Sequence, residues 1–256
     1  MTGLLPHNRR SSEAALKYLI YGGVASGTMI YGMSWIFGMT GSLDYAAIQQ
    51  VLAKTELNKA GLFMAFMFVF AGFGYKIVFV PFHMWSPDVY QGAPTPVTGY
   101  MSAIPKIAAF AAAIRLLVQG LAPLRDDWDI IIAVLALITM VFGNVVAVAQ
   151  RNVKRMLAYS SIAHTGYILA GLAAYDAATG ASAFSGNASD DGVSSVLFYL
   201  LAYTIMNIGA FAVIAWVQHR GPGLTLDDLS GLARNNVLAA TAMAVFMIAL
   251  MGLPPT

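Results

Sequence analysis

Two lysines lie in stretches of the chain that are otherwise soluble in lipid. Lys76 falls in an apolar run that Pro81 interrupts, and Lys106 follows Pro105 in the middle of the next run. A lysine at the centre of a bilayer costs roughly 3 kcal/mol on insertion scales, so it is rarely kept without a function. A buried amine that gains and loses a proton as its surroundings change can relay protons, and we interpret both lysines this way.

The alternative is that these amines reach the interface or bind a backbone carbonyl. Lys17 fits that alternative, because it lies in the first turn of an expected helix, where Glu13 stands four residues before it in the favourable order for an ion pair. Lys106 is too far from either end of its run to reach the interface easily.

The carboxylates give the lysines no partner inside the membrane. All twelve acidic residues fall in the termini or in loops, and Glu13 is the one nearest to an apolar segment. The buried lysines are therefore either largely neutral or paired with groups outside this chain, and we favour the second.

Two histidines accompany the lysines. His83 follows Pro81, and His164 lies in the middle of an apolar segment beside serine and threonine. Two such histidines could ligate a haem, but only His164 is clearly at membrane depth, so a haem site is disfavoured. For His164, a neutral imidazole bonded to serine or water and a member of a proton path both stay open.

Composition sets the class of the protein. Apolar residues make up 59% of the chain and charged residues 10%, where soluble domains carry about 25% charged residues. The chain is therefore an integral membrane protein. It has no cysteine, which excludes disulfides and thiolate-bound zinc or iron–sulfur clusters, and its net charge of +2 does not suggest a nucleic-acid partner. Gly72 and Gly74 form no nucleotide fingerprint and predict close helix packing.

The apolar pattern predicts an all-α, polytopic membrane helix bundle of about seven spans. Pro81 should break the second span, and a broken helix must face protein or water. The connection Ser86–Pro96, with its three prolines, is expected to be an ordered turn. The expected spans are Ala14–Gly38, Ala60–Val80 and its extension, Val97–Val118, Ile130–Ala149, Met156–Ala174, Val193–Val217 and a last one from Val237.

Lysines and arginines in alternate loops predict the orientation. The loops on the side of the N-terminus hold seven of them and the opposite loops hold three, which places the N-terminus in the cytoplasm. The first set is Arg9, Arg10, Arg151, Lys154, Arg155, Arg220 and Arg234; the second is Lys54, Lys59 and Arg125.

Two long motifs resemble a known family. PFHMWSPDVYQGAPTPVTGYMSAIPK, followed by AQRNVKRMLAYSSIAHTGY, is similar to the antiporter-like membrane subunits of respiratory NADH:quinone oxidoreductase, complex I, and within that group to the subunit N type. The group also includes subunits of multisubunit sodium/proton antiporters. The VTGYMS that follows APTP favours the subunit N type over the others.

The resemblance implies a fold and a set of roles. The fold would be a bundle of about fourteen helices with two inverted repeats, each containing one broken helix. Lys76 and Lys106 match the family lysines that carry protons along a hydrated axis, and His164 matches a histidine further along it. Glu13, Lys17 and His83 match other polar positions of the family, with less certain roles.

The resemblance also implies that the chain is an internal fragment, a single membrane domain over residues 1–256 covering roughly helices six to twelve. The family glutamate that pairs with the first lysine would precede the chain, and a further lysine would follow it. NADH, flavin, iron–sulfur clusters and quinone would belong to partner subunits, with no cofactor or metal in this chain. The partners would be other membrane subunits and the bilayer of a bacterial inner membrane. A sodium/proton antiporter or membrane-bound hydrogenase subunit, and a purely structural membrane subunit, remain as alternatives.

Overall fold

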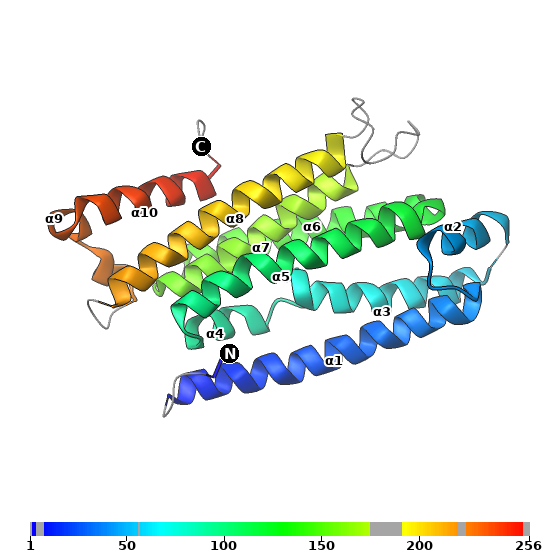
Figure 1. Cartoon of the computed structure of the whole chain (residues 1–256), viewed down its shortest axis with the longest axis horizontal. Coiled ribbons are helices and arrows are strands. Elements are labelled where there is room, and N and C mark those ends of the chain that lie inside the picture. Colours follow the sequence, from blue (N-terminus) through cyan, green and yellow to red (C-terminus); the bar gives the residue numbers. More distant parts are fainter. Residues whose placement is uncertain (1, 4–7, 56, 175–190, 220–223, 253–256) are drawn as a thin grey trace.

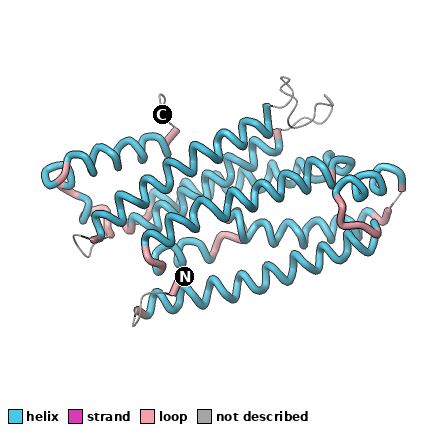
Figure 2. Tube along the Cα trace, in the orientation of Figure 1, coloured by secondary structure: helices cyan, strands magenta, loops and turns pink. Residues whose placement is uncertain are grey.

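Long helices pack side by side along one direction (Figure 1). A computed structural model describes residues 2–3, 8–55, 57–174, 191–219 and 224–252, and this part contains helices and loops but no β-strand (Figure 2). The helices are α1 (Arg9–Thr40), α2 (Tyr45–Lys54), α3 (Lys59–Ile77), α4 (Trp85–Gly92), α5 (Thr95–Arg115), α6 (Arg125–Val148), α7 (Val153–Ala173), α8 (Asp191–Gln218), α9 (Leu232–Asn235) and α10 (Val237–Leu250), with short helices at Leu116–Gly120, Ala122–Leu124 and Asp227–Leu229.

The helix bundle has the surface of a membrane protein. Four helical segments of the described part are long and apolar enough to cross a bilayer: Lys59–Ile77, Thr95–Gly120, Ala122–Val148 and Val193–Gln218. One side of α6 exposes large apolar residues such as Ile130, Val141 and Val145, which would be costly in water. The predicted all-α membrane bundle is confirmed, while the count of about seven spans stays a prediction.

The predicted break near Pro81 is present. α3 ends at Ile77, Val78 adopts a positive φ of 67°, and the next helix begins only at Trp85. Protein groups satisfy the backbone there: the Val80 amide donates to Thr139 Oγ1 at 3.1 Å, and the Trp85 indole donates to the Tyr75 carbonyl at 3.1 Å. The break therefore faces protein, as a break at membrane depth must.

Two connections are more ordered than expected. The stretch Ser86–Pro96 was predicted to be a turn, but most of it forms α4; Pro87 is tolerated there because the first turn of a helix has no intrahelical use for its amide hydrogen. The polar loop after α1 contains α2, whose first turn Asp44 caps by accepting from the Ala47 amide at 3.0 Å.

Small residues allow the helices to approach closely. A Cβ added at Gly72 would lie 2.4 Å from Met29 of α1, and one at Gly74 would lie 2.5 Å from Phe82 beyond the break. These clashes confirm that the GxG pair serves packing. α5 continues through Pro105 without ending, so Lys106 sits on an unbroken helix.

One end of the bundle gathers the N-terminus, α4, the start of α7 and the end of α8, and α2 lies at the other end (Figure 1). Several residues that the sequence pattern places in loops fall outside the described residues, namely His7, Glu56, Arg220 and residues 176–190. The last four residues, at the end of the last expected span, also fall outside them.

Candidate functional site

Lys106 is enclosed between α5 and α7. Its side chain is 2% exposed, and its amine lies 2.8 Å from the Ser161 carbonyl, 2.6 Å from Ser161 Oγ and 3.0 Å from Thr165 Oγ1. An ammonium group has three donors, so these three acceptors satisfy it completely. The prediction that its partner lies outside this chain is therefore wrong for Lys106, because α7 supplies neutral oxygens where an acid was expected.

Thr165 links this amine to the end of the broken helix. Its hydroxyl donates to the carbonyl of Ile77, the last residue of α3, at 2.7 Å while accepting from Lys106. The C-terminal end of a helix carries partial negative charge, which favours a cation nearby. Because α3 ends at Ile77, the carbonyl of that residue accepts from Thr165, and Thr165 in turn accepts from the buried amine.

The hydroxyls beside Lys106 can serve both forms of the amine. Ser161 Oγ lies 2.7 Å from the Tyr203 hydroxyl, and either atom can be the donor. The Asn207 amide donates to the same Tyr203 oxygen at 2.9 Å, and Tyr203 can donate to the Ser102 carbonyl at 3.3 Å. With a charged amine, Ser161 accepts from Lys106 and donates to Tyr203. With a neutral amine, rotation of the hydroxyls reverses both bonds: Tyr203 turns its hydrogen from the Ser102 carbonyl to Ser161, and Ser161 donates to the amine. A proton can therefore leave or arrive while the Lys106–Ser161 and Ser161–Tyr203 contacts persist.

His164 lies beside this network on α7. It is 4% exposed, its Nδ1 lies 2.5 Å from the Tyr199 hydroxyl, and its ring centroid is 5.2 Å from that of Tyr203. The backbone of Leu250, the last residue of α10, lies near His164. The next residue of α7, Thr165, bonds to the last residue of α3.

Lys76 is not part of this cluster. It is exposed on the surface of the described part, one residue before α3 ends, and its amine lies 5.6 Å from the centre of the Tyr75 ring. The described residues therefore do not enclose Lys76, and its place at membrane depth stays a prediction. The carbonyl of Ile77, the next residue along the chain, accepts from Thr165. The end of α3 is therefore connected to the Lys106 cluster through this carbonyl and not through the Lys76 amine.

His83 is buried at 7% exposure against Phe142 of α6, with 4.6 Å between ring centroids. Its Nδ1 has no hydrogen-bond partner among the described residues. The two imidazoles contact different helices, and the described residues contain no group of three metal-ligating side chains.

An ion-pair cluster lies at the end of the bundle that holds the N-terminus. The predicted pair is confirmed, with Lys17 Nζ 2.6 Å from Glu13, and the same amine lies 2.6 Å from Asp88 of α4. Asp88 also forms an ion pair with Arg155 of α7, whose Nη1 lies 2.5 Å from the carboxylate. Sequence reasoning missed Asp88, which joins α1, α4 and α7 at one point.

Comparison with known proteins places this arrangement in a family. Residues 1–256 match the family described as NADH:quinone oxidoreductase/Mrp antiporter, TM. The chain belongs to this family. It is 47% identical to NADH-quinone oxidoreductase subunit N of Chlorobium chlorochromatii, over 100% of this chain and 49% of that protein. The chain spans about half the length of the curated relatives it matches.

Solved structures of the antiporter family share the fold. A chain of respiratory complex I from Thermus thermophilus with bound aureothin matches with a TM-score of 0.75 and 33% identity, covering 98% of this chain and 50% of that one. A chain of the Mrp complex from Dietzia matches with a TM-score of 0.83 at 24% identity, covering 96% and 43%, which shows likeness of fold alone.

Several residues around Lys106 and His164 were not identified from the sequence. Ser161 and Thr165 were noted only as neighbours of His164, and Tyr199 and Tyr203 were not singled out. A signal was available, because Tyr199, Tyr203 and Asn207 recur every four residues on a largely apolar helix. That spacing places all three on one face.

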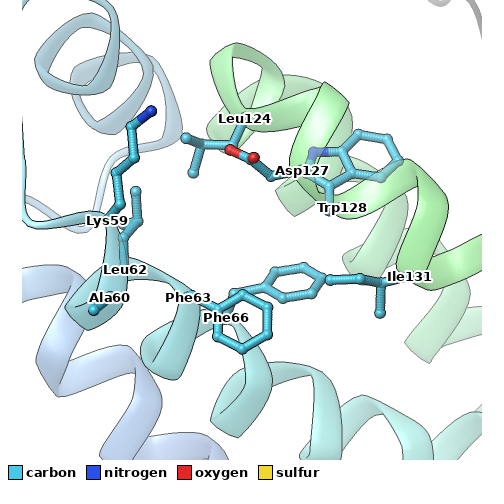
Figure 3. A pocket seen from close by; sticks show the side chains of 9 residues that line it. All are labelled: Lys59, Ala60, Leu62, Phe63, Phe66, Leu124, Asp127, Trp128 and Ile131. Carbon is cyan, nitrogen blue, oxygen red and sulfur yellow. The ribbon is translucent and has the colours of Figure 1, made fainter.

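A separate pocket of the bundle has no buried titratable side chain among the described residues that line it. It has a volume of about 380 Å³ and lies between the first turns of α3 and α6 (Figure 3). Lys59 and Asp127 stand at opposite sides of it, both exposed, and apolar side chains such as Phe63 and Ile131 fill the wall between them. No titratable side chain that lines this pocket is buried, so it offers no site comparable with Lys106.

Proposed function

We propose that this chain is the proton-conducting part of a membrane subunit of a proton-translocating NADH:quinone oxidoreductase, without a redox centre of its own. The observation that carries the proposal is the Lys106 cluster, in which a buried amine is held by hydroxyls that can donate or accept. Such a group can change its protonation state without leaving a buried polar atom unpaired. Similarity of the whole of this chain to about half of a curated subunit N protein supports the same proposal.

The proposed path runs from Lys76 to Lys106 and on to His164. Lys76 takes up a proton from the cytoplasmic side, water carries it to Lys106, and Ser161, Tyr203 and the His164 region receive it next. Electron transfer in neighbouring subunits would supply the energy by changing charge or hydration near Lys76. Glu13, Lys17 and His83 are proposed as supporting groups, and the ion pairs of Lys17 favour a role in holding helices together for that residue.

Membership of the family supports proposals on the orientation of the chain, its place in the subunit and its partners. We propose that the N-terminus faces the cytoplasm of a bacterial cell, that the chain forms roughly helices six to twelve of the subunit, and that other membrane subunits are its partners. NADH, flavin, iron–sulfur clusters and quinone would be held by those partners.

Replacement of Lys106 or Lys76 by alanine in the complete subunit of an assembled complex tests the proposal. NADH-driven proton uptake by membrane vesicles should fall about tenfold or more per assembled complex, because a positioned proton-transfer group contributes at least that much. Unchanged uptake with normal assembly would refute the role.

The shared fold with an Mrp complex keeps a sodium/proton antiporter subunit as the second candidate. That function predicts proton movement that depends on sodium and not on NADH. A purely structural subunit predicts that the two alanine variants lower assembly or stability while proton uptake per assembled complex stays normal.

A further inference from the structure

A third lysine is buried at the end of the bundle that carries the N-terminus. Lys154 is 2% exposed and lies in the first turn of α7, two residues after the capping residue Asn152. Burial and the positive end of the helix dipole both act against a positive charge at this position. The sequence pattern assigned Lys154 to a basic connection, where a solvated side chain would be expected.

The amine of Lys154 is only partly satisfied. It donates to the backbone carbonyl of Ala93, in the connection between α4 and α5. Within the described residues it forms no ion pair with a carboxylate. Since an ammonium group has three donors, the remaining ones are available to water.

Lys154 lines a large polar pocket. The pocket has a volume of about 730 Å³, is open to the outside, and is formed by the α4–α5 connection, the start of α7 and the end of α8. Its titratable lining residues are Arg10, Lys154, His219 and Asp228. The Asp228 carboxylate accepts hydrogen bonds from the Thr225 hydroxyl at 2.6 Å and from the Thr225 amide at 2.8 Å. Water in this pocket would connect the buried amine with the solution at this end.

The same face of α7 leads from this pocket to Lys106. Ser161 and Thr165, which hold the Lys106 amine, follow Lys154 by two and three helical turns. Two turns span about 11 Å at the α-helical rise. That separation is too long for a direct hydrogen bond, so an intermediate polar group is needed.

Tyr90 of α4 supplies such a group. It is 1% exposed, and its hydroxyl has no hydrogen-bond partner among the described residues, although the Ser86 and Ser161 side chains lie near it. Ser86 Oγ is also buried without a partner in this part of the chain. An unsatisfied buried hydroxyl costs about 1–3 kcal/mol, and buried water commonly provides the missing bond.

We propose that Lys154 and Tyr90 form an intake that carries protons from the polar pocket to Ser161 and Lys106. Lys154 releases a proton to neighbouring water and regains one from the pocket, and the Tyr90 hydroxyl accepts one proton while donating its own towards Ser161. No covalent bond other than O–H and N–H changes, and no electron is transferred. The intake rests on the proposed function, because it feeds the same buried amine.

Two substitutions of Lys154 separate proton exchange from support of the fold. Lys154→Gln keeps a donor for Ala93 but loses the titratable amine, and Lys154→Arg keeps the donor and the charge but does not release its proton. In the complete subunit of an assembled complex, both should slow NADH-driven proton uptake about tenfold, with Lys54→Gln, an exposed lysine of α2, as the control. Wild-type uptake with Lys154→Arg would mean that the residue only holds the Ala93 carbonyl, and the proposal would be wrong.

Tyr90→Phe tests the second step without a loss of packing. It removes only an unpartnered hydroxyl, so melting temperature should stay equal or rise while proton uptake falls. Tyr100→Phe, at a position 55% exposed, is the matched control. Normal uptake with Tyr90→Phe overturns the route, and this variant decides the question if the Lys154 variants fail to assemble.

Lys106→Ala in the same assay distinguishes failure of the proposed function from failure of the intake alone. If Lys106→Ala pumps normally, the proposed function fails. If Lys106→Ala is impaired while the Lys154 and Tyr90 variants pump normally, only the intake fails.

Discussion

Lys106 and Lys76 differ in what surrounds the same side chain. Lys106 is enclosed by two helices and receives three oxygens from α7, whereas Lys76 is exposed on the described part and has an aromatic ring as its nearest partner. A buried amine needs acceptors supplied by the protein, because a polar group removed from bulk water without a hydrogen-bond partner is costly. The difference shows that this chain supplies all the hydrogen-bond partners of Lys106 and leaves Lys76 exposed on the described part.

The largest expected difference between the two positions is in chemical access. The chain has no cysteine, so Lys76→Cys and Lys106→Cys each introduce a single thiol. A small thiol reagent should modify Lys76→Cys in the detergent-solubilised chain at least about a hundredfold faster, because reaction needs an exposed thiolate. Mass spectrometry over time gives both rates. Similar rates would contradict the difference in exposure between the two positions. If Lys76→Cys reacts in this chain but is protected in the complete subunit, further helices cover it.

Stability should separate the two lysines next. Lys106→Ala leaves a cavity and three buried oxygens without their donor, which should lower the free energy of unfolding by about 2–4 kcal/mol. Lys76→Ala should change it by less than about 0.5 kcal/mol, as expected for an exposed side chain. Denaturant titration of the complete subunit in detergent measures both values, and equal losses would contradict the comparison.

Thr165 sharpens the comparison at the end of α3. Thr165→Val keeps the shape of the side chain but leaves the Ile77 carbonyl and the Lys106 amine each one bond short, at a cost of about 1–2 kcal/mol. Thr165→Ser should retain most of the stability. Thr241→Val is the matched control, because the Thr241 hydroxyl is exposed and bonds only within its own helix. The same unfolding titration applies, and a neutral Thr165→Val would show that the link is not needed.

The smallest effect is expected at the ion pairs. Glu13→Gln removes one partner of Lys17, but Glu13 is exposed, so the loss should stay near about 0.3 kcal/mol. Asp88→Asn should cost more, because Asp88 pairs with both Lys17 and Arg155. Melting temperatures at low and high salt check the order. A larger loss for Glu13→Gln than for Asp88→Asn would contradict it.

Much of the fold could be predicted because apolar runs have no alternative in lipid except helices. The segments containing Lys76, Lys106 and His164 were placed on helices, and the break near Pro81 was located, since a proline removes one donor from the backbone ladder. α4 and α2 were missed because short helices in polar connections carry little periodic signal. The Glu13–Lys17 pair was predicted, since neighbours on one helix turn depend only on spacing.

The sequence by itself determined that this is a helical membrane protein, which residues carry charge into its apolar segments, and to which family it is similar. These properties depend on composition, on spacing along single helices and on long contiguous motifs. Only the tertiary structure decided that Lys106 is enclosed, that Lys76 is exposed, and that Lys154 is buried beside a polar pocket. Each of those facts depends on contacts between residues more than fifty positions apart, such as Lys106 with Ser161 and Lys154 with Ala93, and no local pattern records which helix faces which.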